Sequence, residues 1–161
     1  MTDTFIDILV MLVAANGAPV LTARCLGPRL AWPVDGGRTL PDGNPLFGSS
    51  KTWRGVIAIL GASTVAAALL GYSAGFGLAF GALVMAGDLL SSFLKRRRGL
   101  PASSRATGLD QLPESLLPAL FTTAYLGLEW WWAPLWAAAF MLLEIVVSKP
   151  LFLLHIRKRP Y

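Results

Sequence analysis

The sequence contains little of what enzymes use for redox chemistry or for zinc binding. Among 161 residues there is one cysteine, Cys25, and one histidine. A single thiol cannot form an internal disulfide, and without a cluster of cysteine and histidine no structural zinc site is expected. These absences exclude thiol-based redox catalysis and zinc binding as leading interpretations.

Charge is also scarce in this chain. Only 14% of the residues are charged and 55% are hydrophobic, whereas soluble domains carry about 25% charged residues. The chain therefore has more apolar surface than one small core can bury, which indicates exposure to lipid. We expect a single all-α integral membrane domain over residues 1–161. We expect no nucleic-acid partner, although the formal net charge is +5, because in a membrane protein basic residues report on topology.

Five apolar stretches have the length of membrane-spanning helices, which need about 20 residues. They lie at residues 4–23, 55–72, 74–94, 112–133 and 134–154. Small residues are dense in the second and third stretches, which predicts close helix packing within one chain or in a homodimer. Three consecutive tryptophans, Trp130 to Trp132, are predicted at the outer end of the fourth stretch, where indole rings favour the headgroup level.

The basic residues are distributed unevenly between the connecting segments. All lysines and arginines except Lys149 follow the first, third or fifth stretch, within residues 24–54, 95–105 and 157–159. Short cytoplasmic loops collect Lys and Arg. We therefore expect a multi-pass protein of the cell (inner) membrane, with its N-terminus outside and its C-terminus in the cytoplasm. Its two polar loops, and any active site they form, then face the cytoplasm.

The third stretch ends with an acid, a hydroxyl and a basic cluster on one helical face. Asp88, Ser92, Lys95 and Arg96 are aligned at 100° per residue. Ionisable side chains are costly at membrane depth and face a bundle interior or a wet cavity. This stripe predicts a polar site. An ordinary basic helix end with one buried acid is the plainer interpretation.

The segment before the second stretch has the composition of a phosphate-binding loop. Its glycines allow close backbone approach, and its cations and hydroxyls suit phosphate oxygens. The Walker pattern is absent, because two serines separate Gly48 from the lysine. A turn-rich basic loop without a ligand is the alternative. The candidate binding residues are Asp35, Asp42, Lys51, Thr52 and Arg54.

Asp110 and Gln111 directly precede the fourth stretch. Mg²⁺ binds one or two carboxylates together with substrate phosphates, so Asp110 and Asp88 are predicted to share a Mg²⁺ ion. A helix N-cap is the alternative role of Asp110, and Glu114 is a further possible acid. Two basic loops with two acids between them predict a nucleoside triphosphate site that a lipid phosphate can reach from the bilayer.

The motifs together resemble those of the CDP-archaeol synthase family. The resemblance covers nearly the whole chain and rests on residues 15–19, 33–55, 87–99 and 109–111. These segments contain Ala-Asn-Gly-Ala-Pro, Pro-Leu-Phe-Gly-x-x-Lys-Thr-Trp-Arg-Gly, Gly-Asp-Leu-x-x-Ser-Phe-x-Lys-Arg-Arg and Leu-Asp-Gln. The family transfers CMP from CTP to an ether-lipid phosphate, releases pyrophosphate and depends on Mg²⁺. Part of the third segment is also similar to bacterial phosphatidate cytidylyltransferase.

The resemblance implies a role for each candidate residue. Asp88, Lys95 and Asp110 are the implied catalytic residues, and Asp88 and Asp110 are the implied metal ligands. The implied substrate-binding residues are Asp35, Asp42, Lys51, Thr52, Arg54, Ser92, Arg96, Arg97 and Gln111. The implied partners are CTP and a membrane lipid phosphate.

Other functions stay open at this point. A CTP-dependent polyprenol or lipid kinase uses the same substrates but breaks CTP at the γ-phosphate. A non-catalytic membrane subunit or a small transporter would use the basic loops only to set its orientation. A CDP-alcohol phosphotransferase is disfavoured, because the opening Asp-Gly-x-x-Ala-Arg of that family is absent.

Overall fold

The computed structural model describes residues 2–102, 104 and 108–153, with the backbone alone for residues 148–153. It contains the helices α1 (Thr2–Leu26), α2 (Trp53–Leu69), α3 (Ala74–Arg97), α4 (Gln111–Leu126) and α5 (Trp132–Leu153). Within those ranges the only β-pairing is two isolated bridges. The all-α prediction is confirmed.

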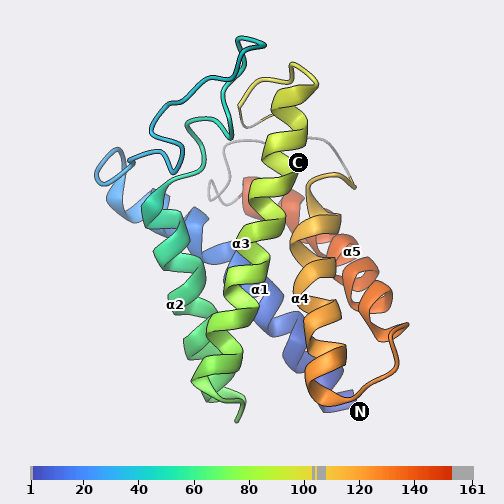
Figure 1. Cartoon of the computed structure of the whole chain (residues 1–161). Coiled ribbons are helices and arrows are strands. Elements are labelled where there is room, and N and C mark those ends of the chain that lie inside the picture. Colours follow the sequence, from blue (N-terminus) through green and yellow to red (C-terminus); the bar gives the residue numbers. More distant parts are fainter. Residues whose placement is uncertain (1, 103, 105–107, 154–161) are drawn as a thin grey trace.

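The helices form one bundle with two different ends. Figure 1 shows α2, α3 and α4 in front of α1 and α5 beside α4, with the loops that follow α1 and α3 together at one end. The short α2–α3 and α4–α5 turns lie at the other end, near the start of α1. We call these the loop end and the turn end. The two polar loops thus share one end of the bundle.

The helices differ in whether they are long enough to cross a membrane. Within the described residues, α1 and α3 are long and apolar enough by length and composition. The helices α2 and α4 have 17 and 16 residues. At 1.5 Å per residue, 16 residues span about 24 Å, against a hydrocarbon core of about 30 Å. Five complete crossings stay a prediction.

The predicted end of the fourth stretch is wrong. The helix α4 ends at Leu126, because Gly127 adopts a left-handed conformation with φ 64° that terminates the helix. Trp130 and Trp131 lie exposed between α4 and α5, and Trp132 is the first residue of α5. Apolar composition alone could not mark this break, because a tryptophan-rich turn is as apolar as a membrane span.

The other helix ends differ less from prediction, and capping explains two of them. The second stretch begins earlier than predicted, at Trp53, because the Thr52 hydroxyl accepts a hydrogen bond from the Gly55 N–H and caps α2. Ser73 caps α3 by accepting from the Phe76 N–H. The helix α3 continues to Arg97, which places its basic residues beside the negative end of the helix dipole.

Small residues pack α2 tightly against α3, as predicted. A Cβ added at Gly77 would lie 2.6 Å from the Ala67 Cβ, and one added at Gly81 would lie 2.8 Å from the Ser63 Oγ. Contacts this short leave no space for a side chain at either glycine. The small residues therefore serve packing within the chain, and a homodimer stays a prediction.

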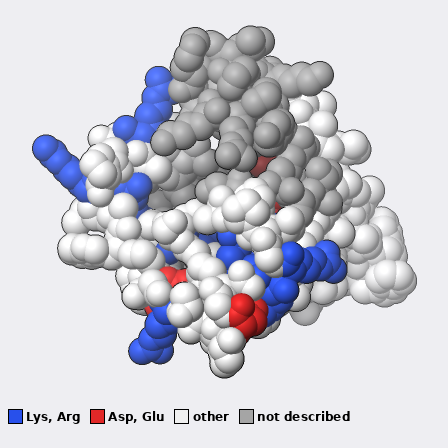
Figure 2. Space-filling view, turned by 90° about the horizontal axis from the view of Figure 1, so that it is seen from above, with Lys and Arg blue, Asp and Glu red and all other residues white. Residues whose placement is uncertain are grey.

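Basic side chains gather at the loop end. Figure 2, which views this end, shows lysines and arginines around its visible face with few acidic residues among them. This agrees with the charge asymmetry of the sequence. Arg105 and residues 157–159, which contribute to that asymmetry, lie outside the described residues.

Candidate active site

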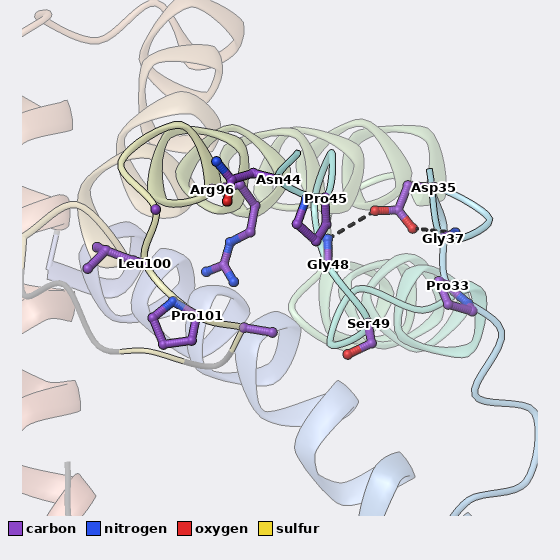
Figure 3. A pocket seen from close by; sticks show the side chains of 12 residues that line it. Pro33, Asp35, Gly37, Asn44, Pro45, Gly48, Ser49, Arg96, Leu100 and Pro101 are labelled. Atoms are coloured by element: carbon purple, nitrogen blue, oxygen red, sulfur yellow. Dashed lines mark hydrogen bonds between the residues drawn. The ribbon is translucent and has the colours of Figure 1, made fainter. Parts of the chain in front are cut away.

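Asp35 organises the loop between α1 and α2. Its carboxylate accepts backbone hydrogen bonds from Gly37 at 3.0 Å and from Phe47 and Gly48 at 2.9 Å each (Figure 3). Burial alone would raise the pKa of Asp35, but these backbone donors outweigh burial and lower the pKa. Both carboxylate oxygens thus shape the loop, and a direct contact of Asp35 with substrate stays a prediction.

Lys51 and Asp88 connect this loop to α3. The Lys51 Nζ lies 2.5 Å from Oδ1 and 2.6 Å from Oδ2 of Asp88. The two side chains are 19% and 21% exposed, so the pair is accessible yet largely shielded from water. The loop thus places the Lys51 ammonium group against Asp88, the acid that the sequence predicted at membrane depth.

Thr52 and Arg54 stabilise the start of α2. Thr52 supplies the N-cap, and Arg54 donates from NH1 to the carbonyl oxygens of Gly27 and Arg29. Arg54 therefore ties the end of α1 to the start of α2. Both residues also line a cavity with Lys51.

The basic residues that end α3 point in different directions, because successive helical residues are 100° apart. The Lys95 Nζ lies 2.5 Å from Oδ1 of Asp110 and donates to the Ser104 carbonyl at 3.2 Å. Lys95 therefore fixes the loop that precedes α4. Arg96 is 3% exposed, and its Nε has no hydrogen-bond partner in the described part of the chain.

Arg97 fixes the other loop. Its NH1 pairs with Oδ2 of Asp42 at 2.6 Å, and its NH2 donates to the carbonyls of Asn44 and Pro45 at 3.3 and 2.6 Å. The guanidinium also lies 5.2 Å from the centre of the Phe93 ring. Hydrogen bonds from Asn44 and the pairing with Arg97 lower the pKa of Asp42. These contacts give Asp42 and Arg97 a positioning role.

Two cavities lie beneath the loops. The inner cavity, of about 360 Å³, is lined by apolar residues of α1, α2 and α3, which include Pro19, Ile59 and Met85, and by charged residues that include Lys51 and Asp88. The outer cavity, of about 330 Å³, lies between the first loop and the segment after α3. Figure 3 shows the Arg96 side chain directed toward the other residues that line the outer cavity. Ser49 lines both cavities.

Comparison with known proteins identifies the family. No protein-family model matches the chain. A CDP-archaeol synthase from Hyperthermus butylicus is 40% identical over 70% of this chain and 69% of its own length. Another from Aeropyrum pernix is 37% identical over 99% of this chain and 94% of its own. The chain belongs to the CDP-archaeol synthase family. A match with the CDP-archaeol synthase of Thermococcus onnurineus, at 45% identity, covers 61% of each protein.

A solved structure supports the same family at the level of fold. It is described as an intramembrane enzyme for archaeal membrane lipids biosynthesis, and it matches with a TM-score of 0.70 and 32% identity over 86% of this chain and 91% of its own. The predicted family resemblance is confirmed. The chain is thus a membrane protein of a lipid-biosynthetic cytidylyltransferase family, which disfavours a transporter or a non-catalytic subunit.

In this member of the CDP-archaeol synthase family, the predicted site residues fall into four groups. Lys51, Thr52, Arg54 and Asp88 line the inner cavity, and Asp35 and Arg96 line the outer cavity. Lys95, Asp110 and Gln111 lie together at the start of α4, where Gln111 Oε1 accepts a hydrogen bond from the Gly108 N–H at 2.9 Å. Ser92, Asp42 and Arg97 line neither of these two cavities.

The carboxylates suit Mg²⁺ by donor type. Asp88 and Asp110 each lie 2.5 Å from a lysine ammonium group, so both face a cationic group already. Among the described residues no three Asp, Glu, His or Cys side chains form a cluster that could hold a metal ion. Mg²⁺ needs only one or two carboxylates when substrate phosphates complete its shell. The residues therefore fit a Mg²⁺ ion that binds together with a nucleotide.

The contact between α3 and α4 beside Asp88 was missed in the sequence. A Cβ added at Gly87 would lie 2.2 Å from the Pro113 carbonyl oxygen and 2.5 Å from the Glu114 nitrogen. The two helix backbones thus touch next to the candidate catalytic acid. The glycine before Asp88 was the available signal in the sequence. Why a glycine is needed at this position depends on which helix packs against it.

Proposed function

We propose that this protein is a cytidylyltransferase that moves CMP from CTP to an archaeal-type ether-lipid phosphate, giving CDP-lipid and pyrophosphate. The inner cavity supports the proposal, because apolar residues of three helices line the same space as cationic and acidic side chains. Such a cavity suits a molecule with a hydrocarbon part and a phosphate. The relatives named CDP-archaeol synthase support the same chemistry.

The proposed reaction is a direct displacement at phosphorus. A lipid phosphate oxygen attacks the α-phosphorus of CTP, the bond from that phosphorus to the oxygen bridging to the β-phosphorus breaks, and pyrophosphate leaves. Lys51 and Arg54, at the inner cavity, and Arg96, at the outer cavity, supply positive charge for the phosphates. Phosphoryl chemistry needs positioning and charge neutralisation more than a covalent nucleophile.

In this proposal Asp88 and Asp110 hold the Mg²⁺ ion, which when bound neutralises phosphate charge. Lys51 and Lys95 occupy the same carboxylates in the structure. Asp88 and Asp110 would hold the cation in place of these two ammonium groups, and Lys51 and Lys95 would then be available to phosphate oxygens.

We further propose that the loop end faces the cytoplasm, with the N-terminus outside. The gathering of basic residues at the loop end supports this orientation. Cys25 is the only cysteine and lies exposed near the end of α1, so its labelling shows on which side of the membrane the loop end lies. A membrane-impermeant maleimide should label Cys25 in inside-out vesicles and leave it unlabelled in intact cells. Labelling of Cys25 in intact cells would show that the loop end faces outside, which is the opposite orientation.

The reaction is tested by pyrophosphate release from CTP with purified protein, Mg²⁺ and a panel of ether- and ester-linked lipid phosphates. We expect release that requires a lipid phosphate and is fastest with an ether lipid. Asp88→Asn should lower the rate by about 10³-fold, as expected for lost electrostatic stabilisation. Asp3→Asn, which changes an exposed acid at the turn end, is the matched control.

The products distinguish the proposed cytidylyltransferase from a CTP-dependent lipid kinase. CDP-lipid and pyrophosphate support cytidylyl transfer. Phosphorylated lipid and CDP would instead establish the kinase. Absence of CTP binding would overturn both reactions.

A further inference from the structure

Four exposed apolar side chains lie where α1 connects to α2, at the loop end. Leu30, Trp32 and Trp53 are 52%, 67% and 51% exposed. The Trp53 N–H donates to the Trp32 carbonyl oxygen at 3.0 Å, so the segments that carry the two tryptophans lie side by side. Ile57, also exposed, follows Trp53 by about one turn on the same face of α2. We call these four residues the rim patch. An exposed apolar patch marks a contact with a membrane or with another molecule.

The backbone at Leu30 adopts an unfavourable conformation. Its φ of 54° is the only positive φ at a non-glycine position in the described part of the chain. A residue with a Cβ rarely adopts this conformation, and it persists where the surrounding structure fixes it. Arg54 fixes it here, because NH1 donates to the carbonyl oxygens of Gly27 and Arg29 in the same turn. Figure 1 shows this turn beside the start of α2. The fold therefore keeps an apolar side chain exposed at a position that suits glycine or asparagine better.

The rim patch borders the inner cavity. Ala31, which lies between two patch residues in the sequence, lines this cavity. Thr52 and Arg54, on either side of Trp53, line it as well. The cavity is also lined by residues of α1 and α2. A molecule that reaches the patch from the bilayer is therefore next to the inner cavity and its charged residues.

The chemistry of the patch suits the surface of a lipid bilayer. An indole ring has a large apolar face and a polar N–H, and it favours the headgroup level of a membrane. Ile57 extends the patch along α2, away from the loops, as a lipid-facing surface requires. Arg24 and Arg29 are exposed at the end of α1 and in the turn that follows. Their charge complements the negative phosphates of lipid headgroups.

We propose that the rim patch contacts the cytoplasmic leaflet, and that the lipid phosphate enters the inner cavity there, between α1 and α2. The choice of leaflet and of substrate rests on the proposed function. The hydrocarbon chains stay against the patch while the phosphate moves toward Lys51. Arg54 is then also a positioning residue for this route, because it fixes the turn that carries Leu30.

Spin labelling tests the membrane contact without using the reaction. Trp32→Cys in a Cys25→Ser background leaves one cysteine in the full-length chain, and a nitroxide label on it is measured in vesicles of an anionic ether lipid. We expect the label to collide more with oxygen, which dissolves in lipid, than with a water-soluble nickel complex. Thr39→Cys in the same background, exposed in the same loop, is the matched control and should collide mainly with the nickel complex. A Trp32 label as accessible to the nickel complex as the Thr39 label would overturn the proposal. A label shielded from both reagents would indicate a protein partner and would overturn it as well.

Kinetics tests the entry of the lipid at the same patch. Leu30→Asn removes the apolar side chain, and asparagine tolerates the left-handed backbone, so the melting temperature should not change. The KM for a lipid phosphate presented in vesicles should rise about 5-fold, because apolar contact with the lipid is lost. The KM for CTP should stay unchanged. Leu69→Asn, which changes an exposed leucine at the other end of α2, is the matched control. An unchanged KM for the lipid, or an equal rise for both substrates, would contradict entry at the patch.

Failure of this inference is distinguishable from failure of the proposed function. If the Trp32 label lies in lipid while no lipid phosphate yields pyrophosphate, the membrane contact is supported and the reaction alone is overturned. If pyrophosphate release is normal while the label lies in water, the reaction stands and the role of the rim patch is overturned.

Discussion

The two ends of the bundle are held together by different forces. At the turn end, Phe76, Phe80 and Trp136 are almost fully buried, and Phe76 stacks on Tyr72 with ring centres 5.1 Å apart. At the loop end, segments distant in sequence are joined by ion pairs at 2.5–2.6 Å and by the backbone hydrogen bonds of Asp35. A buried apolar side chain has no alternative partner outside the core, whereas a charged side chain in an ion pair can exchange one partner for another. The turn end therefore keeps the helices in place, whereas the contacts at the loop end can exchange partners, as the proposed function requires.

Gly87→Ala should have the largest effect, because it disrupts the close contact between α3 and α4 directly beside Asp88. The new Cβ would lie 2.2 Å from the Pro113 carbonyl oxygen, a backbone atom that cannot move alone. We expect a loss of about 3 kcal/mol, at the upper end for overpacking, and loss of pyrophosphate release. Thermal unfolding in detergent, followed by circular dichroism, measures the first effect.

Gly61→Ala is the matched control for this change. Gly61 also lies within a helix, but a Cβ there meets nothing within 4 Å. This variant should be neutral or stabilised by up to about 1 kcal/mol. Equal melting temperatures of the two variants would contradict the close contact of α3 with α4.

Asp35→Asn should have an intermediate effect, confined to the loop end. The carboxylate accepts three backbone hydrogen bonds, and loss of its charge should cost about 1–3 kcal/mol. Because the pKa of Asp35 is lowered in the folded protein, its contribution is fully present above the unfolded pKa. It is lost as the pH falls through the folded pKa.

The stability difference between native protein and Asp35→Asn should therefore be constant near neutral pH and shrink below about pH 4. Unfolding measured at pH 7 and at pH 3.5, roughly the range where Asp titrates, checks this dependence. CTP binding should weaken along with stability, because the loop borders both cavities. A difference that grows on acidification would refute the assigned sign.

Arg97→Gln should have the smallest effect. Its partner Asp42 has a side chain 41% exposed, and exposed ion pairs contribute little. We expect the KM for CTP to rise by about 2- to 5-fold with kcat nearly unchanged, and the difference to fade in high salt. Arg98→Gln, an exposed neighbour at the end of α3, should leave the KM unchanged. A fall in kcat for Arg97→Gln would indicate direct contact with the reacting groups.

The stripe on α3 shows how far local pattern carries a site prediction. Helical spacing predicted that Asp88, Ser92, Lys95 and Arg96 share one polar face, and in the structure Ser92, Lys95 and Arg96 are buried while the Asp88 side chain is 21% exposed. It did not predict that Lys95 and Arg96 separate, with one on Asp110 and the other at the outer cavity. The partner of a side chain at a helix end depends on which loop folds over it. That choice involves residues far away in the sequence.

The three tryptophans at residues 130–132 show where a prediction from composition fails. Residues 130–132 are apolar, and composition alone assigned them to the fourth span, yet Gly127 ends α4 before them. Backbone conformation at one glycine decided the boundary. Hydropathy averages over many residues and cannot resolve such a single dihedral angle.

The membrane class, the helical architecture and the family could be predicted from the sequence, because apolar length, helical period and motif spacing are local properties of the chain. The structure alone shows that Lys51 meets Asp88, 37 positions away in the sequence, that Arg97 holds the first loop and that the α3 and α4 backbones touch at Gly87. These contacts depend on the packing of α3 on α4 and on loops that fold over the helix ends. Their energies arise between distant segments, so no local pattern contains them.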